Sequence, residues 1–248
     1  MIRLLQSWGV PVMMTGVYGV LMWSSETDNT GKAWMAIGLA MVLVLWWLFG
    51  TLTATAALSR SLNVGDTKTT VELVDGLLAR KKQPAVRAPL LVARARALEL
   101  RGDWAGVLAA LDQADVSAIA EPQRASWQVF AAATRIGALT ETGKVADARR
   151  LVGSELDPAA AKLDRRTDRA ALLHAPLARG RVAAAEGATE KAIPLLQAVL
   201  DEVHSGGAAR ALAHFYLARI ESEPVAATHR AEIAKLLADE TLWLRTAR

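Results

Sequence analysis

Residues 90–114 read LLVARARALELRGDWAGVLAALDQA, and this stretch decides the fold class that we predict. It holds an alanine- and arginine-rich segment, a break at Gly102-Asp103, and a second segment with regularly spaced aliphatic side chains. Alanine, leucine, arginine and glutamate are strong helix formers, and a glycine between two such segments is typical of a tight turn. The stretch therefore predicts two antiparallel helices joined by that turn.

The same pattern recurs further along the chain, in Phe130–Leu156 and Leu173–Leu200, and a weaker fourth copy begins near Ala208. The turn glycines of the three clear copies are 41 and 44 residues apart; they are Gly102, Gly143 and Gly187. Repeats of this period indicate stacked helix pairs, because one pair alone cannot bury its apolar surface. We therefore predict an all-α array of antiparallel helix pairs.

The copies resemble the tetratricopeptide repeat (TPR) family, whose hallmark is a helix pair with small residues at the crossing and a glycine turn. The positions that fit are Ala95, Leu98, Gly102, Trp104, Leu111 and Ala114 in the first copy, Leu139, Gly143 and Ala148 in the second, and Gly180, Ala183, Gly187, Ala192 and Leu196 in the third. The spacing exceeds the family's usual value of about 34, Val107 stands where a small residue is expected, and Pro176 and Pro194 interrupt the third copy. The resemblance covers about residues 85–240. It implies a protein-interaction module whose first helices line a concave groove.

The N-terminal part is strongly apolar. Residues 4–23 contain no ionisable side chain except the phenol of Tyr18, residues 33–58 contain none, and the polar sequence SSETDNTGK separates them. As helices they would be roughly 30 and 39 Å long, against a hydrocarbon core of about 30 Å. We therefore predict a membrane hairpin of two transmembrane helices in residues 1–58, a connecting helix over 59–84 and a TPR-like α-solenoid over 85–248.

Other interpretations of the apolar segments are a cleaved signal peptide, two buried helices of a soluble protein, and a first segment that lies partly in the membrane interface. Arg3, Arg60 and Lys68 flank the segments, against Lys32 alone in the loop. This balance predicts a two-pass protein of the bacterial inner membrane with both termini and the repeats in the cytoplasm. The layout is similar in architecture to the HemY-like bacterial membrane proteins, and we carry no function across from them.

Five arginines recur at fixed distances before the turn glycines. Arg94, Arg135 and Arg179 lie eight residues before a glycine, and Arg96 and Arg181 share a register two residues further on. The second register faces the groove in TPR domains, and guanidinium groups bind carboxylates in a bidentate manner. We predict that these arginines bind an acidic segment of a partner protein. The alternative is that they bridge adjacent helices and hold the stack together.

Residues 80–101 hold seven basic side chains and one acid, Glu99. The predicted lipid-surface strip within this run consists of Arg80, Lys81, Lys82 and Arg87, which would contact anionic lipid heads. The alternative is pairing with the acidic run over residues 103–121, where each exposed ion pair contributes little stability.

The sequence contains no cysteine, and its four histidines form no H-E-x-x-H pattern. It also lacks a phosphate-binding glycine loop, a nucleophile elbow and a recognised nucleic-acid motif. We therefore predict no enzyme activity, cofactor, metal site or nucleic-acid partner. The predicted function is a membrane-anchored scaffold or adaptor for protein–protein interaction, and the alternative is a structural subunit of a larger membrane complex held through its hairpin. Homo-oligomerisation is left open.

Overall fold

The computed structural model describes residues 36–43, 57–203, 205–237 and 242–246. The chain divides into two compact units, Met1–Ala57 and Leu58–Arg248. In the first unit, the described residues 36–43 are helical.

The prediction of two transmembrane helices is wrong for the described residues, among which no helix is long and apolar enough to cross a membrane. Most of the predicted spans 4–23 and 33–58 lies outside the described residues. The predicted inner-membrane location and orientation rested on those spans and stay untested.

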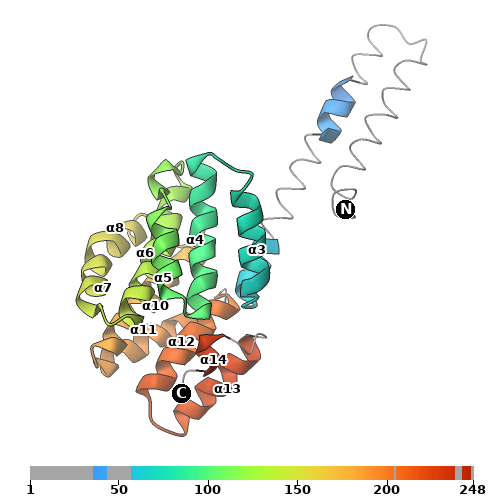
Figure 1. Ribbon diagram of the computed structural model, residues 1–248. Coiled ribbons are helices and arrows are strands. Elements are labelled where there is room, and N and C mark those ends of the chain that lie inside the picture. Colours follow the sequence, from blue (N-terminus) through green and yellow to red (C-terminus); the bar gives the residue numbers. More distant parts are fainter. Residues whose placement is uncertain (1–35, 44–56, 204, 238–241, 247–248) are drawn as a thin grey trace, which may run out of the picture. The chain divides into compact units, whose positions relative to one another are not determined.

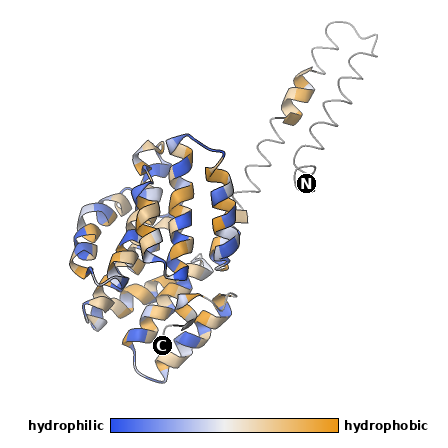
Figure 2. Cartoon of the chain, in the orientation of Figure 1, coloured by the Kyte–Doolittle hydropathy of each residue, from blue (hydrophilic) through white to orange (hydrophobic). Residues whose placement is uncertain are grey.

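The second unit is all-helical in its described part, as predicted, and each helix carries hydrophobic and hydrophilic residues together (Figure 2). Its elements, shown in Figure 1, are α3 (Thr67–Leu78), α4 (Pro84–Arg101), α5 (Trp104–Asp112), the 3₁₀ turn η1 (Val116–Ala118), α6 (Gln123–Glu141), α7 (Val145–Leu151), the π-helical turn η2 (Val152–Leu156), α8 (Asp157–Ala160), α9 (Arg169–Leu172), α10 (His174–Ala185), α11 (Thr189–Asp201), α12 (Gly207–Ile220), α13 (Val225–Leu236) and α14 (Trp243–Thr246).

Consecutive helices pack as antiparallel partners, in the pairs α4/α5, α6/α7, α10/α11 and α12/α13. The first three pairs turn at the predicted glycines, where Gly102, Gly143 and Gly187 have φ values of 72°, 78° and 72°. Only glycine adopts this left-handed conformation without strain, so it ends the first helix and reverses the chain within a few residues. The predicted helix–glycine–helix units are therefore confirmed.

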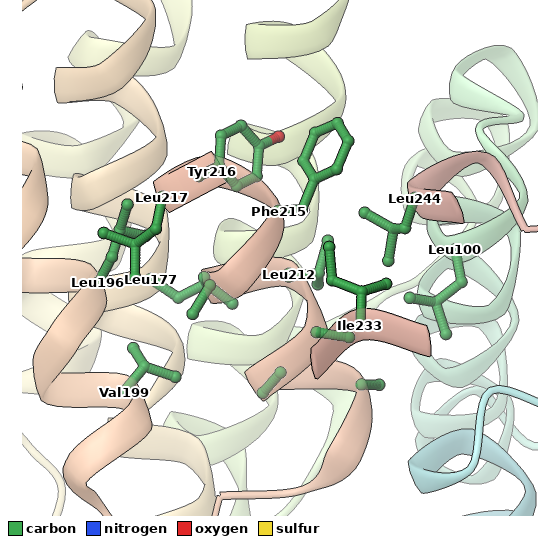
Figure 3. Packing of buried hydrophobic residues seen from close by; sticks show 14 of the residues in the cluster. Leu100, Leu177, Leu196, Val199, Leu212, Phe215, Tyr216, Leu217, Ile233 and Leu244 are labelled. Carbon is green, nitrogen blue, oxygen red and sulfur yellow. The ribbon is translucent and has the colours of Figure 1, made fainter. Parts of the chain in front are cut away.

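The first helices of the pairs, α4, α6, α10 and α12, pack against one another in sequence, and the largest hydrophobic cluster lies around α12. Leu177 of α10, Leu196 of α11 and Ile233 of α13 converge there with Leu212 and Phe215 of α12 (Figure 3).

The short α14 packs against both α4 and α12, and therefore joins the first and last helix pairs of the unit. The indole N–H of Trp243 donates a hydrogen bond to the Glu99 carbonyl oxygen at 2.6 Å, and its ring contacts Phe215 and Trp104 edge-on.

Candidate functional site

The three arginines that lie eight residues before a turn glycine each form an ion pair with an aspartate of an earlier helix in the array. The pairs are Arg94–Asp75 at 2.9 Å (α4 to α3), Arg135–Asp112 at 2.8 Å (α6 to α5) and Arg179–Asp157 at 2.7 Å (α10 to α8). Their side chains are partly exposed, so each pair contributes about 0–1 kcal/mol. The contacts join successive helices, and binding of a partner by these arginines stays a prediction.

The second register contains a buried ion pair. Arg181 of α10 donates from Nη1 to Glu99 Oε1 of α4 at 2.5 Å, and the two side chains are only 2% and 6% exposed. Between these helices lies α6, where a Cβ atom on Gly137 would overlap the Arg181 guanidinium. Gly137 lies six residues before Gly143, just as Arg181 lies six before Gly187. The glycine thus leaves the space through which Arg181 reaches Glu99.

Arg96, the other arginine of this register, lies over the Phe130 ring at 4.9 Å, with its Nη2 3.4 Å from His174 Nε2. Burial holds the pKa of His174 well below its ordinary value, and the neighbouring charges of Arg96 and Arg181 lower it further. His174 is therefore neutral and accepts from Arg96.

Tyr216 of α12 extends the network to the last helix pair. Its hydroxyl donates to Glu141 Oε1 of α6 at 2.5 Å, and the Arg181 guanidinium lies 5.0 Å from its ring centre. Burial raises the pKa of Tyr216, so the phenol stays protonated. Burial lowers the pKa of Arg181, the ion pair with Glu99 raises it, and Arg181 remains charged.

The result is a buried polar centre, which we define as Arg96, Glu99, Glu141, His174, Arg181 and Tyr216. It links the inner faces of α4, α6, α10 and α12. The cavity beside Arg96, Glu99 and His174 measures about 10 Å³, which is room for about one water molecule. Within the centre Arg181 is ion-paired with Glu99, while Glu141 pairs with Arg219 at its edge, so the centre ties helices together and leaves little space for a substrate.

Two open grooves lie beside the arginines of the first register. The larger, of about 480 Å³, runs between α5, α6, η2 and α8, and Arg135 lines it; we call it the α6 groove. The other, of about 390 Å³, is lined by Arg179 and Asp157 on the opposite side of α8. The π-helical turn that forms one wall of the α6 groove leaves no pattern in the sequence that we could recognise.

The predicted lipid-surface strip divides into two parts. Arg80, Lys81 and Lys82 are exposed in the loop between α3 and α4. Arg87 turns back and donates from Nη1 to the carbonyl oxygens of Leu78 at 3.0 Å and Lys81 at 3.2 Å. Arg87 therefore supports the loop, and lipid contact by the strip stays a prediction.

A histidine chain that we did not predict joins α12 and α13. His214 Nδ1 lies 2.7 Å from His229 Nδ1, and His229 Nε2 lies 2.8 Å from Glu221 Oε2. Burial and the neighbouring His229 lower the pKa of His214 to about 4. Within the described ranges, no group of three or more histidines or carboxylates is arranged to hold a metal ion.

Comparison with known proteins adds no relative: no protein-family model matches the chain, and no curated protein or solved structure shows significant similarity to it.

Proposed function

We propose that this chain is a non-enzymatic helical-repeat scaffold of the TPR type that binds a partner protein. The observation that carries the proposal is the α6 groove, an opening of about 480 Å³ between successive helix pairs with apolar side chains on its floor and charged groups at its edge. Such grooves between helices are a recurrent site for protein segments.

The contrast between the open α6 groove and the buried polar centre supports a binding role. Acid–base catalysis needs titratable groups that reach a substrate. Here Glu99 and Arg181 are paired with each other, His174 is buried against Arg96, and the adjoining cavity has a volume of only about 10 Å³. The inner faces of the helices are thus occupied by the chain's own side chains, and a partner would bind elsewhere.

The test is crosslinked capture with the tagged full-length chain from cells that express it natively, quantified by mass spectrometry. A matched pair of variants reverses one partly exposed, ion-paired arginine at a time: Arg135→Glu in the groove and Arg230→Glu on α13, which pairs with Glu223. We expect one partner to be lost with Arg135→Glu and retained with Arg230→Glu. Capture of no partner, or equal capture by both variants, would contradict the proposal.

A further inference from the structure

We infer that the contact between α12 and α13 is a pH-sensitive switch: in acid, α13 separates from α12 while the other helix pairs of the unit stay folded. The groups that carry it form the histidine chain, which consists of His214 on α12, His229 on α13 and Glu221 just after α12. The inference is independent of the proposed function, because it concerns a movement within the chain and needs no partner.

The contact between the two imidazoles limits the number of protons that the pair can hold. His214 Nδ1 lies 2.7 Å from His229 Nδ1, a distance at which one nitrogen donates and the other accepts. His229 Nε2 lies 2.8 Å from Glu221 Oε2 and donates to this carboxylate. One added proton makes His229 an imidazolium that donates both to Glu221 and to His214. A second added proton would put N–H groups on both Nδ1 atoms, and these groups would repel each other at that distance.

The surroundings of the pair also oppose a second positive charge. His214 is only 8% exposed. In the described part of the chain, the charges that act on it lie on α12 and α13: they are Arg210, one helical turn before it, His229 and Glu232, and α10, α11 and α14 contribute none. Burial, His229 and Arg210 lower the pKa of His214 to about 4, and only Glu232, which is paired with Lys235, acts in the opposite direction.

The helix α13 is held in place by few apolar contacts. It is the outer helix of the last pair, and it packs against α12 and the short α14 (Figure 1). Only Ala226 and Ile233 are buried among its 12 residues, whereas α10, which has the same length, buries eight. Its ion pair Arg230–Glu223 is local to the helix and the turn before it. A helix with so few buried contacts opens at a lower free energy than the whole unit, so loss of the histidine contact releases it first.

The direction of the pH effect follows from the protons that each form binds. Once α13 has separated, both imidazoles are in water and their pKa values return to about 6.5. In the closed form, His214 takes up its proton only near pH 4. Between these values the open form holds more protons than the closed form, so the opening equilibrium rises about tenfold for each pH unit that the pH falls. Above about pH 6.5 this driving force is absent and α13 stays packed on α12.

The experiment is hydrogen–deuterium exchange of the full-length chain from about pH 7.5 to about pH 5, read by mass spectrometry and corrected for the intrinsic exchange rate at each pH. We expect the protection of the α13 amides to fall about tenfold per pH unit below about pH 6.5. The amides of α6 should stay more strongly protected than those of α13 at every pH. Equal protection of α13 and α6 throughout would mean that the unit opens as a whole and would overturn the inference.

His214→Asn is the variant that removes the switch. Its side-chain amide can donate to His229 or accept from it, but it takes up no proton. The protection of α13 should therefore be close to that of the wild type near neutral pH and should no longer fall in acid. Arg230→Gln is the matched control on α13, because it loses the local ion pair with Glu223 and keeps both histidines. Its protection should fall with pH as steeply as that of the wild type.

Glu221→Gln distinguishes a titration from a merely structural contact, and it decides the question even if His214→Asn does not fold. The amide oxygen still accepts from His229 Nε2, but the negative charge that balances an imidazolium is gone. We expect α13 to be protected as in the wild type near neutral pH and less protected than the wild type in acid. A loss of protection that is the same at every pH would contradict the switch. So would a wild-type α13 whose protection does not change with pH, or an equal fall in the wild type and His214→Asn.

Discussion

Replacing Gly137 with alanine adds a single methyl group to α6 at the position that the Arg181 guanidinium occupies. Intrinsic helix propensity favours alanine over glycine by roughly 1 kcal/mol. Against this gain, Arg181 would have to leave its place between Glu99 and the Tyr216 ring. Separating a buried ion pair costs roughly 3–5 kcal/mol, because one charge stays buried without its partner. We therefore expect a net destabilisation of about 2–4 kcal/mol.

The assay is unfolding of the full-length variant by heat and by urea, followed by circular dichroism. For a domain of this size, the expected loss corresponds to a fall in the unfolding midpoint of roughly 4–16 °C. The matched control is Gly76→Ala on the exposed side of α3, where a new Cβ would meet no atom within 4 Å. We expect the control to be neutral or up to about 1 kcal/mol more stable than the wild type.

A double-mutant cycle then tests whether the destabilisation caused by Gly137→Ala depends on the Arg181 side chain. Gly137→Ala should cost much less in an Arg181→Ala background, because the shortened side chain no longer fills the space beside α6. If Gly137→Ala alone is as stable as the Gly76→Ala control, or if its cost is the same in both backgrounds, then Arg181 does not occupy the Gly137 position in solution and our account of the buried polar centre is wrong.

Three further predictions concern stability. Arg181→Met alone should destabilise the chain by about 3–5 kcal/mol, whereas Glu99→Met/Arg181→Met should recover most of this in urea unfolding, because no buried charge is left unpaired; equal losses would contradict this. Stability should fall as the pH drops from about 6.5 to 4, because the pKa values of His174 and His214 are lowered in the folded state and protons bind the unfolded chain more readily; a flat unfolding midpoint over that range would refute it. Trp243→Ala should cost about 3–5 kcal/mol, since it removes the contacts with Phe215 and the hydrogen bond to Glu99, and an unchanged midpoint would show that α14 does not hold the end helix pairs together.

The elements that could be predicted from the sequence are those with a local cause. The glycines at 102, 143 and 187 were recognisable because a left-handed residue is needed where a helix reverses direction. The recurrence of the arginines could also be predicted, because each lies a fixed number of residues before a turn glycine. The ion-pair partners of the arginines could not be predicted. Arg181 and Glu99 are 82 residues apart, and only the packing of α4, α6 and α10 brings them together.

The N-terminal prediction failed for a different reason. A count of apolar residues measures whether a segment could cross a membrane if it formed one long helix, and it does not itself establish that helix. Of the predicted spans, the structure describes only residues 36–43 and 57–58, and no described helix is long and apolar enough to cross a membrane. The histidine chain could not be predicted, because His214 and His229 are 15 residues apart on different helices. The turn η2 could not be predicted either, because nothing in the sequence of Val152–Leu156 distinguishes a π-helical turn from an α-helix.

The departure of one copy from the repeat explains how a buried ion pair can join α4 and α10 past α6. Arg96, Gly137 and Arg181 occupy the same position, six residues before the turn glycine of their copies. A side chain larger than hydrogen at 137 would exclude the guanidinium from its place beside α6, and Arg181 could then not reach α4. The glycine lets one arginine bind a glutamate two helix pairs away, and the ion pair lies buried between the inner helices. Grooves remain open beside α8, and the Arg135 and Arg179 ion pairs lie beside them.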